Sequence, residues 1–422
     1  MTGVITHSDR YRLPFARDSV IFDEMVPVAT SGALRVADVR RRNRAIVLAQ
    51  LRDGQRWSRA DLARSTTLTT EGIRELLTDL IADRLVLEVQ ASSPAPRRGR
   101  PPTYYELNAC SGAAVGVSIG RRYITAVLTD AAGTEVGRRE VEVSSLSVDS
   151  VVSQISEAVE VLVAPAEELD TDFLSVCLSI HGDVDPETGV VHEAPAMGWV
   201  DVGLAELVDR QLGRGKVRCI DGARATTVAV HREGVAKGRS DVVVLDLSNW
   251  LAAGLILNGS LYTGAIGLAG QIGTCPVPSS NGPSMLSATA SGRAVVNRYR
   301  ESGHESASVW RDVVDASRSG DPAAAAALEE SGLAIVAAGA WLVGCFGPEL
   351  LVLGGAISDL GPAYVSQIIT DIYANCGRRA RGHVEIVGSV LGRDAWVRGA
   401  VHVALDIVHE QQQSSIPTAR AS

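Results

Sequence analysis

Hydrophobic residues recur with a helical period between residues 69 and 84. The apolar positions fall three, four, seven and eight residues after the first, and they are Ile73, Leu76, Leu77, Leu80 and Ile81. Residues at these spacings line one face of a helix. The other face is polar and carries Thr70, Glu71, Arg74, Glu75 and Asp79. The pattern predicts an amphipathic helix with its cap at Thr69.

A shorter helix is predicted just before it, over residues 58–65. Ser58 and Asp61 have the spacing of a capping box, in which a hydroxyl and a carboxylate close the first turn of a helix. The linker of residues 66–68 is short, and Thr67 stands at a turn position where glycine is usual. Two short helices joined by a tight turn are typical of a helix-turn-helix. A helical hairpin in any core shows the same pattern, so the flanking segments have to decide.

An arginine-rich loop follows the second helix. Residues 85–89 and 104–107 have the composition of strands, and residues 92–102 between them are rich in Pro, Gly and Arg. A strand, a basic loop and a strand after a recognition helix form a winged helix, whose loop arginines reach phosphates or the minor groove. A solvated linker is the alternative, and the flanking strands favour the wing.

The charge of this segment is opposite to that of the remaining chain. Residues 35–105 contain 14 Arg, no Lys and 8 acidic residues, a net charge of +6, whereas the whole chain carries −9. A basic module on an acidic body is expected of a protein that binds the phosphates of double-stranded DNA. The predicted DNA-binding residues are Arg59, Arg64, Thr69, Thr70, Glu71, Arg74, Arg97, Arg98 and Arg100. Among them, Thr70, Glu71 and Arg74 are expected nearest the bases.

A different texture begins near residue 113. Three apolar strands in a meander are followed by alternating helices and strands, and the same succession starts again near residue 242. The repeat predicts two related α/β lobes with a cleft between them. The predicted domains are a flexible extension (1–34), a winged helix-turn-helix (35–108), a two-lobed body (109–411) and a disordered tail (412–422).

Composition excludes several other classes. The chain is 46% hydrophobic and 21% charged, as expected of globular domains. It has no uninterrupted run of 18 apolar residues and no signal-peptide pattern, so we expect a cytoplasmic protein without a membrane span. The six cysteines are scattered without a CxxC pair, which favours reduced thiols over a metal site.

Several ordered motifs resemble the ROK family (repressors, open reading frames and sugar kinases), in particular its winged-helix repressor branch. Residues 116–120 resemble its first phosphate strand, 179–185 its Pro-Gly-Pro-Val-Asp turn and 194–199 its substrate-side loop. Residues 267–274 resemble its Gly-x-x-Gly-Glu-x-Gly-His signature, and 353–356 its late glycine motif. The resemblance implies a duplicated, ribonuclease H-like fold with two lobes, as in actin and hexokinase.

The chain departs from the pattern of the family's kinases at the nucleotide and zinc positions. Ser118 and residues 120–122 replace the Asp and the Gly-Gly-Thr turn, and Trp250 stands in the second phosphate turn. The family's zinc motif aligns with residues 278–285, which hold no cysteine, and its histidine ligand aligns with Thr274. A structural zinc site needs about four nitrogen or sulfur ligands. We therefore predict no ATP, magnesium or zinc, and no cofactor.

Asp221 aligns with the catalytic base of the family's kinases, which accepts the sugar hydroxyl proton. Without Mg-ATP such a base transfers no phosphoryl group, so Asp221 is either a ligand acceptor or a structural carboxylate. The resemblance places a sugar-like effector near His181, Trp199, Asp221, Gln271 and Thr274. Core or surface roles for these residues are the alternative.

These observations favour a DNA-binding transcriptional regulator, acting as a repressor, with a degenerate kinase-like body. A homodimer, or a dimer of dimers, is expected to form through the long helices between residues 322 and 345, or through neighbouring surfaces, and to fix the half-site spacing. The competing hypotheses are a sugar kinase with altered motifs and a scaffold that no longer binds DNA.

Overall fold

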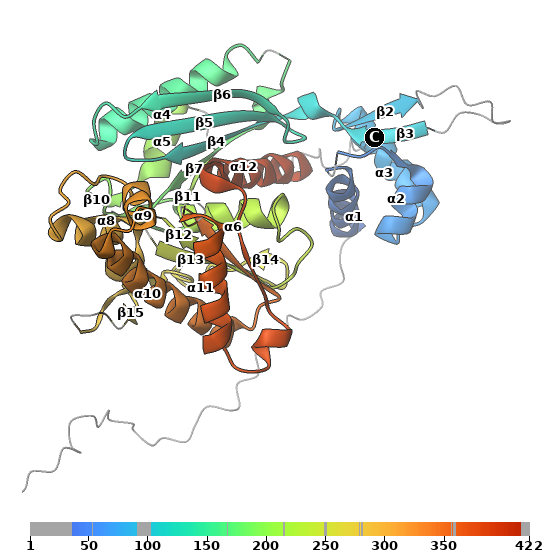
Figure 1. The fold of residues 1–422 in the computed structure, drawn as a ribbon. Coiled ribbons are helices and arrows are strands. Elements are labelled where there is room, and N and C mark those ends of the chain that lie inside the picture. Colours follow the sequence, from blue (N-terminus) through green and yellow to red (C-terminus); the bar gives the residue numbers. More distant parts are fainter. Residues whose placement is uncertain are drawn as a thin grey trace, which may run out of the picture.

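A computed structural model of the chain describes residues 36–414, apart from 53, 91–102, 167, 214–215, 249–250, 278, 280–281, 356 and 358–359. Within these residues the chain forms a small N-terminal module and a larger body of two lobes (Figure 1). The predicted extension 1–34 lies outside the described residues, as do the loop arginines 97, 98 and 100 and the predicted tail from residue 415.

The N-terminal module packs three helices against a small antiparallel sheet. Its helices are α1 (Val36–Leu51), α2 (Arg59–Thr66) and α3 (Thr70–Ala82). The strands β1 (Trp57–Ser58), β2 (Val86–Gln90) and β3 (Thr103–Leu107) pair in the order β1-β3-β2. The apolar face of α3 is buried in the module's own core, as its periodicity predicts. β1 is too short to have a periodic signal in the sequence.

Both predicted helix caps of the module are present. The Ser58 hydroxyl accepts a hydrogen bond from the Asp61 amide at 3.2 Å, and the Thr69 hydroxyl accepts one from the Gly72 amide at 3.1 Å. Each cap satisfies one of the backbone donors that a helix start leaves unpaired. Between the helices, Thr67 adopts a left-handed conformation with φ of 57°. This conformation explains why glycine is the usual residue there.

The first lobe of the body is built on a five-stranded mixed sheet. Its strands are β4 (Ala113–Ile119), β5 (Tyr123–Asp130), β6 (Glu135–Glu142), β7 (Leu174–Ile180) and β11 (Val217–Asp221), in the order β11-β7-β4-β5-β6. Helices α4 (Val148–Val163) and α5 (Leu204–Leu212) pack with the sheet around one core. A separate small sheet contains β8 (Asp183–Val184), β9 (Val191–Ala194) and β10 (Trp199–Val202).

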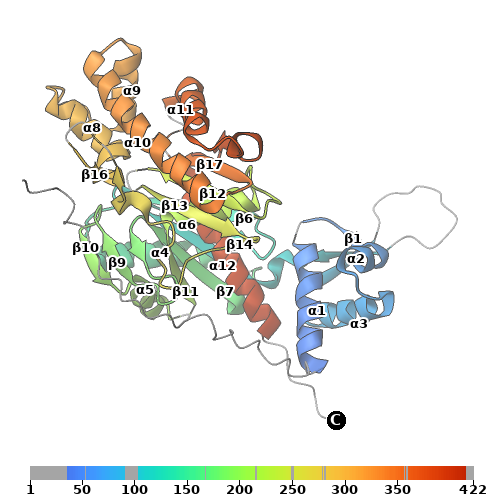
Figure 2. The same ribbon diagram turned by 90° about the horizontal axis from the view of Figure 1, so that it is seen from below.

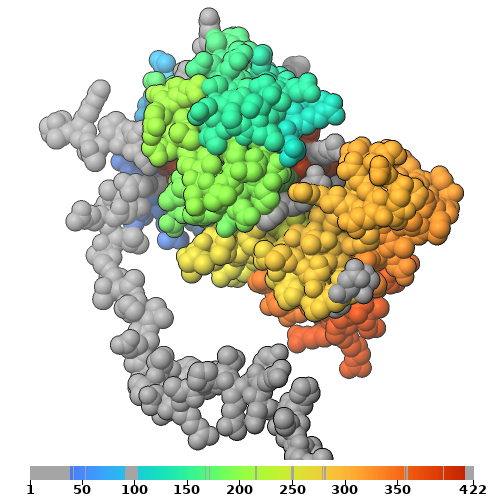
Figure 3. Space-filling view, turned by 90° about the vertical axis from the view of Figure 1, so that its left-hand side faces the viewer, coloured from blue at the N-terminus to red at the C-terminus, as the bar shows by residue number. Residues whose placement is uncertain are grey.

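The second lobe repeats this topology. Its strands are β12 (Val242–Leu247), β13 (Leu251–Leu257), β14 (Ser260–Leu261), β17 (Leu350–Gly355) and β18 (Glu385–Gly388), in the order β14-β13-β12-β17-β18. Both sheets therefore place a three-strand meander beside two parallel strands. The predicted duplication is visible as two masses in Figure 3, where the first lobe (teal and green) lies above the second (yellow and orange).

Helices of the second lobe lie on the side of its sheet away from the first lobe (Figure 2). They are α7 (Leu286–Ala290), α8 (Gly292–Glu301), α9 (Trp310–Arg318), α10 (Pro322–Phe346) and α11 (Pro362–Asn375). A short hairpin of β15 (Pro276–Val277) and β16 (Ser284–Met285) precedes them. Among the described helices, α10 alone has the length and hydropathy of a membrane span, and 61% of that window is buried inside the protein. Core helices of globular proteins share these properties.

Two helices, α6 (Gly222–Arg232) and α12 (Ala395–Ser414), pack against each other between the lobes. α12 covers the first sheet, and α6 covers the second (Figure 1). The predicted end of the body at residue 411 is wrong, because α12 continues to Ser414. Gln412 is buried there and its amide donates to the Ser111 carbonyl at 2.7 Å, which holds the last turn in place.

Candidate functional site

The polar face of α3 is open to solvent. Thr69, Thr70, Glu71 and Arg74 are all exposed, whereas the apolar face of the same helix is buried at Ile73, Leu76, Leu77 and Leu80. Packing of α3 against α1, α2 and β2 therefore presents its first turns, with their polar side chains, at the surface of the module.

Two of the exposed arginines that are predicted to bind DNA are paired with acidic neighbours. Arg74 donates to Glu71 at 3.0 Å, and Arg64 forms an ion pair with Asp61. The Arg74 guanidinium holds the pKa of Glu71 below its ordinary value. Exposed pairs of this kind contribute about 0–1 kcal/mol, so a DNA phosphate can replace the carboxylate at little cost.

Arg59 has a different partner, an aromatic side chain of the neighbouring sheet. Its Nε donates to the Tyr105 hydroxyl at 2.7 Å, and its guanidinium lies 5.6 Å from the centre of that ring. Since Tyr105 belongs to the buried core of the module, this contact fixes the direction of an otherwise exposed side chain.

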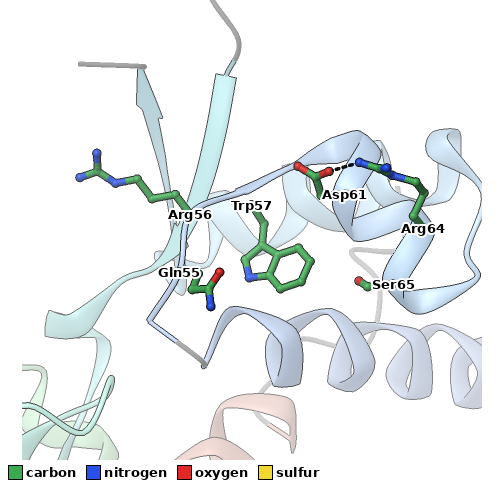
Figure 4. Close-up of a pocket in the computed structure, with 6 residues that line it drawn as sticks. All are labelled: Gln55, Arg56, Trp57, Asp61, Arg64 and Ser65. Atoms are coloured by element: carbon green, nitrogen blue, oxygen red, sulfur yellow. Dashed lines mark hydrogen bonds and ion pairs between the residues drawn. The ribbon is translucent and has the colours of Figure 1, made fainter. Parts of the chain in front are cut away.

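A hollow of about 410 Å³ lies beside α2. Its lining residues are Gln55, Arg56, Trp57, Asp61, Arg64 and Ser65. Figure 4 shows the Trp57 indole in the middle of this group and the ion pair of Arg64 and Asp61 on α2 beside it. The predicted phosphate-binding Arg64 therefore borders a polar recess with one aromatic side chain.

The second candidate site lies between the lobes, where β11 leads into α6. Asp221 is the last residue of β11 and the N-cap of α6, and its Oδ1 accepts from the Arg224 amide at 3.1 Å. The carboxyl group is buried with a residue exposure of 3%, and burial raises its pKa although the Arg224 guanidinium opposes the shift. The cap and the strand end explain why a carboxylate is held at this depth.

Arg224 is the charged partner of Asp221. Its exposure is 1%, and its Nε lies 3.0 Å from Asp221 Oδ2. The two atoms form an ion pair, yet they are angled so that no regular hydrogen bond joins them. The ends of the guanidinium donate to the carbonyl oxygens of Val184, at 3.3 Å, and Gly267. Oδ1 of Asp221 thus accepts from the α6 backbone, while Oδ2 has the Arg224 charge beside it but no regular hydrogen bond.

His181 lies against the start of α6, since a Cβ on Gly222 would stand 2.6 Å from the His181 ring. The ring packs edge-on against Trp396, with 4.0 Å between the two ring centres. Burial lowers the pKa of His181. Trp396 in turn donates its indole N–H to the buried carboxylate of Asp246 at 3.2 Å. The hydroxyl of Thr226 donates to the same carboxylate oxygen at 3.0 Å. A buried polar cluster therefore joins α6, α12 and β12.

The structure brings together only some of the predicted ligand residues. His181 and Asp221 meet at the start of α6, and Gln271 lies nearby with its amide donating to the Gly182 carbonyl at 3.4 Å. Trp199 points into the first lobe, where its indole N–H donates to the Leu146 carbonyl at 2.8 Å. Thr274 is exposed, and its hydroxyl donates to the Gln271 carbonyl at 3.5 Å.

Four residues of this site were not predicted: Arg224, Thr226, Asp246 and Trp396. Apart from the ion pair of Arg224 with Asp221, the contacts that bring them together join segments far apart in the chain, so no local spacing marks them. The one available signal was the position of Arg224, a charged residue among the small residues Gly222, Ala223 and Ala225. Such a residue on a buried helix needs a partner, and Asp221 stands one turn before it.

The expectations about cofactors rest partly on residues outside the description. Trp250 is not described, and neither are residues 278, 280 and 281 of the segment that aligns with the family's zinc motif. Within the described ranges, no group of three or more His, Cys, Asp or Glu side chains is placed to hold a metal ion.

The duplicated lobes and the carboxylate at the end of β11 define a two-lobed α/β protein of the actin-like class. The chain belongs to the ROK family, whose family model matches residues 114–407. Its relatives include regulators and sugar kinases.

Three of these relatives show how far the similarity extends. The xylose repressor of Bacillus spizizenii is 20% identical over 375 residues, which span 87% of this chain and 96% of that protein. A glucokinase of Halalkalibacterium halodurans is 23% identical over 306 residues, 68% of this chain and 92% of the enzyme. The crystal structure of a ROK family transcriptional regulator, described as a homolog of E. coli MLC protein, has a TM-score of 0.73 and 21% identity, and the match covers 89% of this chain and 99% of that one.

Proposed function

We propose that the chain is a cytoplasmic DNA-binding transcriptional regulator, acting as a repressor, whose N-terminal module is a winged helix-turn-helix. The observation that carries the proposal is the orientation of α3. Its apolar face is buried in the module and its polar residues are exposed, as a recognition helix in a major groove requires. Thr70, Glu71 and Arg74 are the proposed base-contacting residues, and Thr69 caps the helix beside them.

Phosphate contacts are assigned to the basic side chains around α3. Arg59 and Arg64 are exposed on α2, and β2 and β3 flank the loop that contains Arg97, Arg98 and Arg100. We propose that this loop is the wing. The strands before and after it pair with each other, and β2 packs beside α3, which supports that role.

The extent of the similarities supports a regulator over an enzyme. The matches to the xylose repressor and to the regulator structure are longer than the body alone, so they reach into the N-terminal module. The match to the glucokinase is short enough to fit within the body. Because the first relative is named for xylose, we extend to this chain the proposal of a carbohydrate-related effector.

A sugar kinase is the second candidate, since the body shares its fold with kinases and Asp221 stands where the family's base is expected. Oδ1 of Asp221 is bonded to the α6 amide and Oδ2 is paired with the buried Arg224 guanidinium, so we infer that the carboxylate is held within the protein rather than presented to a substrate hydroxyl. We propose that the body is not catalytic. A coupled assay with Mg-ATP and a sugar panel tests this, and turnover that is lost in Asp221→Asn would establish the kinase instead.

We further propose a homodimer, or a dimer of dimers, that forms through α10. Leu333 is 67% exposed and Trp341 43% exposed on the outer face of this helix. Exposed apolar residues along one helix are typical of a surface that another chain covers. Sedimentation of Leu333→Asp should show a smaller species than the wild type, and an unchanged sedimentation coefficient would refute this interface.

The DNA-binding proposal is tested by fluorescence anisotropy with the duplex upstream of the protein's own gene. Arg74→Ala should reduce the preference for this duplex over an unrelated one by about 1–3 kcal/mol, because one base contact is lost. Arg98→Ala should weaken binding to both duplexes and reduce the salt dependence by roughly one phosphate contact.

Arg210→Ala is the matched control, because Arg210 also pairs with an acid on its own helix but lies on α5 of the body. It should leave both affinities unchanged. A wild-type protein that binds no duplex at low salt would refute the function. An unchanged salt dependence in Arg98→Ala would refute the wing alone.

A further inference from the structure

Arg224 joins parts of the protein that belong to different lobes. Its Nη1 donates to the carbonyl of Val184 on β8, which belongs to the first lobe. Its Nη2 donates to the carbonyl of Gly267, in the loop that follows β14 of the second lobe. Through Asp221 it is also tied to the end of β11. We infer that the Arg224 side chain takes the place of a bound ligand. Its guanidinium holds the two lobes together when no small molecule is present.

The energetics of a buried cation support this role. An uncompensated buried charge is strongly destabilising, and a buried arginine needs an opposite charge and hydrogen-bond acceptors close to it. Here one carboxylate and two carbonyl oxygens surround the guanidinium. Two of these three acceptors belong to segments that meet only when the lobes are close. Separation of the lobes therefore leaves the guanidinium with at most one of its two carbonyl partners.

The guanidinium also fills the space that a small molecule would need. Arg224 is the first of the largest fully buried side chains of the described chain. Two hollows of the described surface lie elsewhere, one beside α2 and the other between α4 and α5. An effector that enters beside Asp221 must therefore displace Arg224 from Val184 and Gly267.

A second, weaker contact follows the same path between the lobes. Gln271, on the second lobe, donates to the carbonyl of Gly182, which lies beside β8. This bond is neutral and long at 3.4 Å, so it contributes less to holding the lobes together than the two hydrogen bonds of the charged Arg224 guanidinium. The loop that contains Gly267 and Gln271 also carries Ile266, which is 78% exposed, and Leu268, which is 44% exposed. Accordingly, the accessibility of this loop to a protease reports whether the lobes are held together.

The test removes the Arg224 side chain by mutation and then supplies a guanidinium group as a free molecule in solution. Thermolysin, which cuts beside large apolar residues, is applied to the full-length protein, and cuts at Ile266 and Leu268 are followed by mass spectrometry. Arg224→Ala should be cut at least about tenfold faster than the wild type, since the loop loses its buried anchor. Methylguanidinium at a non-denaturing concentration should slow this cutting towards the wild-type rate, while the same concentration of urea should not.

Arg232→Ala is the control, because Arg232 lies on the same helix and makes an exposed ion pair with Asp406 at 2.9 Å. It should be cut at the wild-type rate. If Arg224→Ala does not fold, Arg224→Lys takes its place, since it keeps the charge but not the planar fork, and its loop should still be cut faster than the wild type. Wild-type cutting rates in the Arg224 variants, or faster cutting that ignores methylguanidinium, would overturn the inference. No DNA enters this measurement, so its failure leaves the proposed DNA binding untouched.

Discussion

The crossing of α6 and α12 offers a sharp test of the packing between the lobes. At Gly399 the two helices approach so closely that a Cβ would lie 1.8 Å from the Ala225 carbonyl oxygen and 2.7 Å from its Cα, whereas ordinary contacts begin near 3.4 Å. Gly399→Ala therefore requires α12 to move away from α6 by about 1.5 Å. No rotamer change relieves the clash, because both colliding groups are backbone or Cβ atoms.

The expected loss of stability follows from this geometry. An added methyl group in a tightly packed core costs about 1–3 kcal/mol when side chains can adjust. Here the helices themselves have to separate, and α12 carries Trp396 away from the Asp246 carboxylate to which it is bonded. We expect Gly399→Ala to destabilise the body by at least about 3 kcal/mol.

Differential scanning calorimetry of the body transition measures this loss. The matched control is Gly344→Ala, also within a helix, where a Cβ meets nothing within 4 Å. Since alanine favours the helix by up to about 1 kcal/mol over glycine, the control should be as stable as the wild type or more stable. A Gly399→Ala protein that melts at or above the wild-type temperature would refute the close packing of α6 and α12.

Three other changes have defined outcomes. Thr67→Gly should stabilise the N-terminal module by about 1 kcal/mol in calorimetry, because a β-branched residue is strained at φ of 57°; a lower melting temperature contradicts this. Trp396→Phe should cost about 1.5–3 kcal/mol in urea unfolding, because the buried Asp246 loses a donor, and a loss within error of zero excludes that bond. The pKa of His192, raised by its bond to Asp201, should lie above 6.5 by NMR and fall in Asp201→Asn. That contact therefore stabilises the fold at acidic pH and weakens as pH rises through the raised pKa; equal pKa values in both proteins exclude the contact.

The periodic elements of the fold are those that the sequence predicts well. α3 follows from residues three and four positions apart, and the module's strands follow from short apolar segments around a polar loop. The duplication of the body is predicted for the same reason, since each lobe repeats one order of strands and helices. In each case the signal is local, because it depends on which face of a single element is buried.

The candidate site was predicted less completely because its contacts are not local. Arg224 has its role because it donates to the backbone carbonyls of Val184 and Gly267. Every residue has a backbone carbonyl, so the residue types at these positions do not indicate an arginine partner. Trp199 was expected near the ligand because its motif resembles a substrate-side loop. In the structure its indole instead lies in the core of the first lobe and donates to the Leu146 carbonyl. A motif therefore locates a backbone segment, while the direction of each side chain depends on how the surrounding core is filled.

The two candidate sites are connected by one rigid element. α12 contains 20 residues, which corresponds to about 30 Å of helix. Its first turn holds Trp396 against the buried carboxylate of Asp246, and the helix also contacts α1 of the N-terminal module. Arg52, just after α1, is half-buried, and desolvation lowers its pKa to about 10 although Asp406 and Glu410 of α12 oppose the shift. A helix in a packed core moves as a unit. A change in the contacts that Arg224 makes between the lobes can therefore be transmitted through α12 to the N-terminal module, which carries the proposed DNA-binding surface.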